Sequence, residues 1–216
     1  MALVPRAAAL ALFVVLPLAA CGSGPELVHD APAPAPEGAP LRSPVEFASI
    51  TDPAARSRAM FLEASRVLLH PRCVNCHPAG DSPTQGDHLQ LHDPPIARGA
   101  DDDGVPGLGC ATCHQDRNVE LARVPGAPKW KLAPRVMAWA GKRPPELCAQ
   151  IKDPKRNGGR TLAAIVDHAE HDALVAWGWQ PGSGRVPAPG SQATFGALID
   201  AWVKDGAVCP QEGDKP

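Results

Sequence analysis

The pentapeptide Cys-X-X-Cys-His occurs twice in this chain of 216 residues, at residues 73–77 and again at residues 110–114. Each copy holds two thiols close together and places an imidazole directly after the second thiol. The pattern constrains folding strongly, because both thiols and the imidazole must reach one common group. With eight histidines in 216 residues, a histidine after both Cys-X-X-Cys pairs arises by chance in roughly one case in 700.

Two cysteines at this spacing present both sulfurs to one edge of a haem, whose vinyl groups they bind covalently, and the next residue then ligates the iron. A zinc site of four thiolates is an alternative, but 110 − 76 − 1 = 33 residues separate Cys76 from Cys110, against about 15–20 in such sites. Thioredoxin-like redox chemistry is a further alternative. The two histidines favour two covalently attached haem c groups. The residues expected to hold them are Cys73, Cys76, His77, Cys110, Cys113 and His114.

Each haem iron has a second axial face, and the sequence offers several histidines and methionines for it. We expect His92, in the loop between the motifs, and His168, beside the apolar face of a helix, as the first choices. Met137 is the leading thioether candidate. The remaining candidates are Met60, His70, His88 and His171. A methionine ligand raises the reduction potential relative to a second histidine, so different ligands would make the two haems unequal.

The first 20 residues combine one basic side chain, Arg6, with an apolar run too short to span a bilayer, which predicts a signal peptide. Residues 18–21, Leu-Ala-Ala-Cys, resemble a bacterial lipobox, in which the cysteine is lipidated. An ordinary signal peptide with a stray cysteine is the alternative. Residues 21–45 are rich in Pro and Ala and indicate a tether. We therefore expect an exported lipoprotein, anchored through Cys21 on the periplasmic side of the outer membrane.

The remaining residues, 46–216, have the length of one domain. Without residues 1–20 the chain keeps 20 basic and 23 acidic side chains, since only Arg6 is removed. This balance predicts no polybasic surface and no nucleic-acid partner. The chain has no Tyr and only four Phe and five Trp, with 26 Pro and 20 Gly. Such a domain buries a modest core, which a large apolar cofactor would complete.

Apolar periodicity predicts a mainly helical domain without a substantial sheet. A helix is expected to begin at residues 51–53, with Asp52 as its cap, and to end before Pro71. Further helical segments are expected at residues 135–140, 145–152, 161–177 and 191–206. Residues 78–109 carry little periodicity and predict a long loop that wraps a bound group.

Two cysteines, Cys148 and Cys209, remain once the motifs and the presumed lipid site are assigned. An even remainder in an exported protein favours a disulfide between them. Two buried free thiols are the alternative.

The helix before the first motif, the motif Cys73-Val74-Asn75-Cys76-His77-Pro78 and the ending at residues 198–207 resemble class I cytochrome c domains. The resemblance implies a small helical cytochrome c-like domain that transfers single electrons between redox partners. Residues 56–210 as a whole resemble bacterial di-haem c-type cytochromes associated with isoquinoline oxidoreductase-type molybdenum hydroxylases. That resemblance implies a molybdenum hydroxylase or a respiratory-chain component as the partner. The second motif departs from the one-haem pattern, so the usual methionine ligand is not carried over.

Three functions are compatible with these features. An electron carrier needs no separate substrate pocket, because the haem supplies the redox chemistry. A di-haem enzyme, such as a small peroxidase with one open iron face, is the alternative, although such enzymes are larger and place their motifs in two domains. A zinc-binding module is the third. The sequence favours the carrier.

Overall fold

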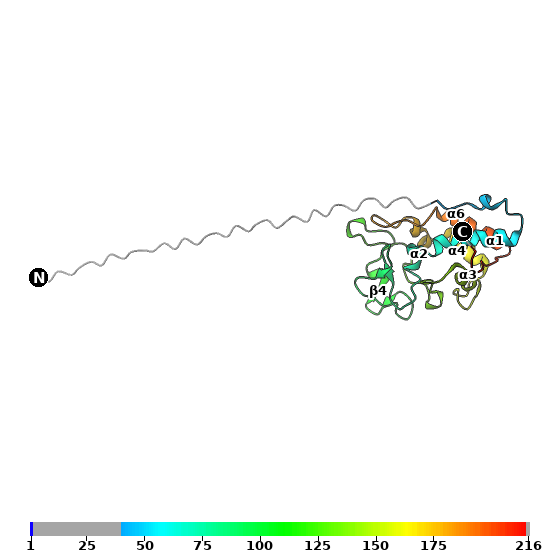
Figure 1. The fold of residues 1–216 in the computed structure, drawn as a ribbon. Helices are drawn as coiled ribbons and strands as arrows, with labels where there is room; N and C mark the ends of the chain where they lie inside the picture. Colours follow the sequence, from blue (N-terminus) through cyan, green and yellow to red (C-terminus); the bar gives the residue numbers. More distant parts are fainter. Residues whose placement is uncertain (2–39, 215–216) are drawn as a thin grey trace. The chain divides into compact units, whose positions relative to one another are not determined.

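The computed structural model describes Met1 and residues 40–214 (Figure 1). The predicted signal peptide, the presumed lipid site Cys21 and most of the tether at residues 21–45 lie outside the described residues. Within the described part of the chain, no helix has the length and apolar character needed to cross a membrane.

Three helices form the core of the fold: α1 (Pro53–Leu68), α4 (Leu162–His171) and α6 (Gln192–Lys204). Helix α6 packs against both α1 and α4, and Figure 1 shows the three gathered away from the strands. The caps follow the sequence, since Asp52 accepts a hydrogen bond from the amide of Ala55 at 2.9 Å and Ser191 accepts one from that of Thr194 at 3.1 Å. The prediction of a mainly helical fold is confirmed.

Helices α1 and α6 are joined by apolar and polar contacts. The rings of Phe61 and Trp202 pack with centroids 4.9 Å apart, and Trp202 is fully buried. The hydroxyl of Ser57 donates to the carbonyl of Trp202 at 3.1 Å and accepts from the amide of Val208 at 3.0 Å. Because both partners of Ser57 lie at the end of α6, this buried hydroxyl fixes that end against α1.

The expected single helix over residues 161–177 is wrong in one respect, because the chain leaves helical geometry at Asp172. The side chain of Asp172 accepts hydrogen bonds from the amides of Leu174 and Val175, at 2.8 and 3.2 Å. These bonds cap a separate short helix, α5 (Ala173–Ala176). An aspartate that can bond to the following amides offers the backbone an alternative to a continuous helix.

The other regular elements are short. The helices are α2 (Pro71–Val74) and α3 (Pro144–Lys152), and the 3-10 turns are η1 (Pro44–Phe47), η2 (Cys110–Thr112), η3 (Glu120–Ala122), η4 (Arg135–Met137) and η5 (Trp177–Trp179). The helical segment expected at residues 135–140 is thus a single 3-10 turn. Cys148 of α3 and Cys209, beyond α6, form the predicted disulfide, with Cα atoms 5.5 Å apart.

The predicted loop at residues 78–109 contains two small antiparallel hairpins. Strands β1 (Thr84–Gln85) and β2 (Gln90–Leu91) form one, and β3 (Gly104–Val105) and β4 (Leu108–Gly109) form the other. The loop is held by the buried side chain of Arg98, which donates to the carbonyls of Gly80 and Ala133 at 3.1 and 2.8 Å.

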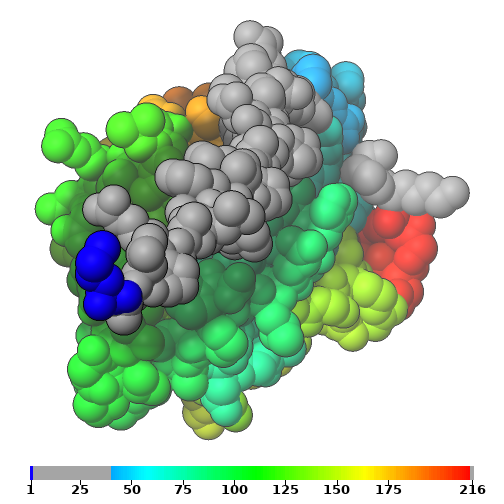
Figure 2. Space-filling view, turned by 90° about the vertical axis from the view of Figure 1, so that its left-hand side faces the viewer, coloured from blue at the N-terminus to red at the C-terminus, as the bar shows by residue number. Residues whose placement is uncertain are grey.

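Among the described residues, the loop segments and the helices lie in different regions of the molecule. In Figure 2 the green loop residues form one side of the view, and the red C-terminal residues lie on the opposite side. Both Cys-X-X-Cys-His motifs belong to the loop-built part or to its border with α1.

Candidate functional site

The first motif follows α1 and begins on α2. His70 caps this short helix by accepting a hydrogen bond from the amide of Arg72 at 3.2 Å, and Pro71 occupies its first position. Cys73 and Cys76 are free cysteines. Burial raises the pKa of the Cys73 thiol to about 12 and that of the Cys76 thiol to about 11. Both sulfurs are therefore protonated thiols at neutral pH.

The imidazole of His77 is fixed on two sides. Its Nδ1 lies 2.8 Å from the carbonyl oxygen of Met137, and because a carbonyl only accepts, Nδ1 is the donor. The ring stacks on the indole of Trp139, with centroids 3.4 Å apart and planes 10° apart. Burial lowers the pKa of His77 to about 3, so the ring is neutral. The free lone pair is on Nε2, the arrangement that suits a metal ligand.

The second motif repeats this arrangement. Nδ1 of His114 donates to the carbonyl oxygen of Pro125 at 2.7 Å, and the ring stacks on Trp130 with centroids 4.7 Å apart and planes 10° apart. Burial lowers the pKa of His114 as well. Cys110 and Cys113 are free cysteines. Each motif therefore combines two thiols with a neutral imidazole whose Nδ1 is bound and whose face is covered by an indole.

A cavity of about 560 Å³ adjoins the second motif. It is lined by Cys110, Cys113 and His114, and also by Cys76 of the first motif. Its apolar lining is contributed by Ile96, Leu108, Val124, Trp130, Leu132 and Trp177. The volume lies in the usual range for cofactor sites, about 300–1,000 Å³. The two motifs thus border one cavity large enough for a cofactor.

His92 lines the same cavity, close to His114 of the second motif. Its ring centroid is 5.9 Å from that of His114, with an angle of 64° between the planes. Nδ1 of His92 donates to the carbonyl oxygen of Pro94 at 2.8 Å, which leaves Nε2 free. The structure therefore brings together His92 and His114, two imidazoles expected at the site from the sequence. In both, Nδ1 donates a hydrogen bond to a backbone carbonyl.

His168 lies on α4, near the first motif. A positive charge on His168 would repel one on His77. The pKa of His77 is lowered mainly by burial, and His168 and Arg160 lower it further. Nδ1 of His168 is 3.2 Å from a carboxylate oxygen of Asp172, so its Nε2 is also free. His171, three residues on, is 68% exposed and lies away from this site, as its helical phase predicts.

Met137 is buried, but its backbone lies behind His77. The carbonyl of Met137 is the acceptor for Nδ1 of His77, so its backbone is on the side of the ring opposite Nε2. The sulfur lies 3.9 Å from Nη1 of Arg160. Met137 therefore contributes its carbonyl oxygen to the orientation of His77.

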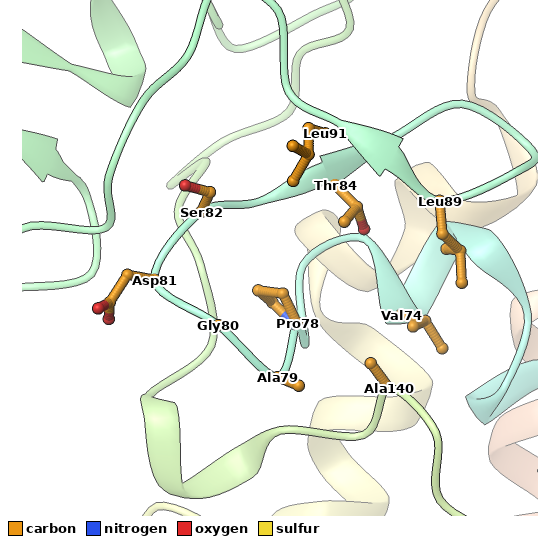
Figure 3. A pocket seen from close by; sticks show the side chains of 10 residues that line it. All are labelled: Val74, Pro78, Ala79, Gly80, Asp81, Ser82, Thr84, Leu89, Leu91 and Ala140. Carbon is orange, nitrogen blue, oxygen red and sulfur yellow. The ribbon is translucent and has the colours of Figure 1, made fainter.

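A second cavity, of about 420 Å³, flanks the first motif (Figure 3). Figure 3 shows Leu91 of the β1–β2 hairpin above Pro78 and Ala79, Leu89 of the same hairpin next to Val74 of α2, and Asp81 pointing away. Leu91 is 76% exposed. This apolar depression leaves the surface beside the first motif open to solvent.

Sequence reasoning did not assign the tryptophans that stack on the motif histidines, nor the arginines of the larger cavity. The five tryptophans were candidates for packing on haem edges, but core packing was the simpler interpretation of them. Among the described residues, no group of three or more His, Cys, Asp or Glu side chains is placed to hold a metal ion. In comparisons with protein families, curated proteins and solved structures, nothing matches this chain.

Proposed function

We propose that this protein is an exported di-haem c-type cytochrome that carries single electrons between redox partners. The observation that supports it best is the repeated arrangement at His77 and His114. At each, a backbone carbonyl binds Nδ1 and an indole covers one ring face. Outer-shell hydrogen bonds of this kind orient metal-bound imidazoles and fix their tautomer.

The residues present fit two covalent haem groups. Cys73, Cys76 and His77 would hold one, and the second motif would hold the other through Cys110, Cys113 and His114. The haem would supply one-electron iron chemistry, and the protein would set its potential and its exposure to solvent. Because Cys76 borders the cavity of the second motif, the two attachment sites lie next to each other, which supports a carrier in which both groups act together.

Two histidines are the proposed second axial ligands. His92 lies beside His114 in the cavity, with ring centroids 5.9 Å apart and its Nε2 free. His168 acts electrostatically on His77 and has its Nδ1 bound to Asp172. Met137 is not proposed for the iron of the first motif, because its backbone lies behind His77. If these two histidines bind the irons, both axial faces are filled, which favours a carrier over a peroxidase that needs one open face.

A zinc-binding module is less well supported. Each pair of motif thiols is followed by an imidazole whose Nδ1 is bound by a backbone carbonyl, and a structural zinc site of four thiolates needs no such imidazole.

Export and anchoring remain proposals from the sequence. A signal peptide at residues 1–20 and a lipid on Cys21 would place the domain on the periplasmic side of the outer membrane. The disulfide between Cys148 and Cys209 agrees with an oxidising compartment. There the partner would be a redox protein, a molybdenum hydroxylase or a respiratory-chain component.

The test uses the full chain, expressed in a host that attaches haem c. The ligand variants are His92→Ala and His168→Ala, and their matched controls are His88→Ala in the same loop and His171→Ala on the same helix. We expect two haems, near-infrared magnetic circular dichroism of the His/His type, and no carbon monoxide binding by the reduced protein. Each ligand variant should bind carbon monoxide at one haem, and neither control should.

Three results would contradict parts of this proposal. A colourless protein without added macrocycle mass would end the haem assignment. Carbon monoxide binding by the unmodified protein would favour the enzyme. A His/Met signature would show that a thioether has been overlooked.

A further inference from the structure

The cavity of the second motif has an excess of positive charge. Four basic residues line it, and Asp93 is its one acidic lining residue among the described part of the chain. The basic residues are Arg72, Arg123, Lys131 and Arg185. Arg123 and Lys131 are exposed and solvated, whereas Arg72 is buried and Arg185 is half-buried. These two guanidinium groups therefore favour an anion in the cavity most strongly, because their charges are the least screened by water.

Arg72 is the most deeply buried of these cations, with 1% of its side chain exposed. It forms an ion pair with Asp87 and donates from Nη2 to the carbonyl of Gly86 at 2.9 Å. Its Nε has no hydrogen-bond partner among the described residues. Its guanidinium also lies 5.8 Å from the ring centroid of Trp177. A buried guanidinium with a free N–H needs a further acceptor.

Arg185 is half-buried, and its hydrogen-bond acceptors are neutral backbone carbonyls. It donates to the carbonyls of Pro181 and Arg123, at 3.0 and 2.5 Å. In the described part of the chain no carboxylate lies within 4.0 Å of it. Burial lowers the pKa of Arg185, and repulsion from Arg72 and Arg123 lowers it further. The charges of Glu120 and Asp87 oppose this lowering only in part, and neither carboxylate forms an ion pair with Arg185.

We propose that Arg72 and Arg185 form a carboxylate-binding pair for the propionates of the haem attached at Cys110 and Cys113. The inference rests on the proposed function, since it concerns the group that the second motif would hold. Guanidinium groups bind carboxylates through two parallel hydrogen bonds, which fixes position as well as charge. A soluble anion is the other source of the same chemistry, and the experiment separates the two.

The pair also links the two motifs. Arg72 directly precedes Cys73 in the chain, but its side chain lines the cavity of the second motif. Positive charge beside a haem stabilises its reduced form, because reduction lowers the positive charge at iron. Arg72 interacts with the thiols of Cys73 and Cys76 as well, so the charge of Arg185 in particular would raise the potential of the second haem relative to the first and draw the electron towards it.

The experiment is a spectroelectrochemical titration of the full haem-loaded chain and of three variants. Arg185→Gln removes the charge, Arg185→Lys keeps the charge without the fork geometry, and Arg117→Gln is an exposed control from outside the cavity. We expect Arg185→Gln to shift the equilibrium for electron sharing between the haems at least tenfold towards the first haem, which is 59 mV for a one-electron couple. Arg117→Gln should leave it unchanged.

Two further measurements show which haem Arg185 acts on and which anion the pair binds. In a Cys110→Ala/Cys113→Ala background, which retains the first haem alone, Arg185→Gln should leave the potential unmoved. Replacing chloride by acetate or sulfate at constant ionic strength should not change the potentials of the unmodified chain, because covalently placed propionates occupy the pair. An anion-dependent potential would show that the pair binds soluble anions, and would overturn the propionate assignment.

A second readout does not depend on the charge-removing variant. The propionate bending modes in the resonance Raman spectrum follow hydrogen bonding to the carboxylates and should shift in Arg185→Lys. Unchanged modes with unchanged midpoints would overturn this inference and leave the proposed function standing. A chain that attaches no haem would instead remove the proposed function.

Discussion

Loss of the disulfide between Cys148 and Cys209 should lower the free energy of unfolding by about 4 kcal/mol. The bond joins residues 61 apart in sequence. In the chain-entropy model, a loop of this length restricts the unfolded chain by about 14 cal/mol/K, or about 4 kcal/mol at 25 °C. That is a large part of the stability of an ordinary domain, about 5–15 kcal/mol.

The cross-link also reaches the first motif through α3. Gln150 of this helix donates to the carbonyl of Val136 at 2.8 Å, and the next residue, Met137, supplies the carbonyl that binds Nδ1 of His77. Lys152, the last residue of α3, donates to the carbonyl of Ala207 at 2.6 Å. When α3 is released from the end of α6, the carbonyl behind His77 loses part of its support.

The assay is guanidinium unfolding, followed by tryptophan fluorescence, of the oxidised chain, the thiol-reduced chain and Cys148→Ala/Cys209→Ala. Thiol reduction isolates the cross-link, because it keeps both sulfur atoms in place. The double variant also loses two sulfur atoms, at least one of them fully buried, and should be destabilised further by roughly 1 kcal/mol or more. Ascorbate, which reduces haem iron and spares disulfides, is the control. A loss below about 1 kcal/mol on thiol reduction would refute the reasoning.

Two further predictions concern helix α1. Ser57→Ala removes both hydrogen bonds that tie α1 to the end of α6 and should lower the free energy of unfolding by about 1–3 kcal/mol, measured by denaturant titration; an unchanged midpoint would contradict it. Burial opposes ionisation of Glu63, but hydrogen bonds from Arg42 and Arg66 outweigh it and lower its pKa. Glu63 therefore stabilises the fold above the unfolded pKa of about 4.3, and this contribution is lost as pH falls through the lower folded pKa. Glu63→Gln should flatten the acid limb of a stability profile, and an unchanged acid limb would contradict this prediction.

The helices could be predicted from the sequence because their determinants are local. Asp52 and Ser191 cap α1 and α6 as expected, and the apolar stripes of these helices face each other. The disulfide followed from the count of cysteines. The break at Asp172 could not be predicted from the apolar stripe, since that stripe continues to Ala173 and the outcome depends on which amides the carboxylate binds.

For the candidate site, the sequence predicts which side chains take part but not which backbone groups orient them. The motifs fix which thiols and imidazoles belong together, and His92 was selected from its place in the loop. The acceptors for Nδ1 of His77 and His114 are backbone carbonyls 60 and 11 residues away. A carbonyl has no sequence signature, so its position is known only once the loop is folded.

The division between helices and loops has a physical consequence for the proposed function. The helical part is held by a buried apolar core, a disulfide and paired polar groups such as Ser57. The loop part has two-residue strands, and it contains Arg72 and Arg98, each with a buried Nε that lacks a partner in the described part of the chain. Regular hydrogen bonding therefore contributes little to the loop part. A covalently held, carboxylate-bearing macrocycle would supply both the missing apolar contacts and an acceptor at the cavity of Arg72, so on the proposed function the haem completes the fold as well as the site.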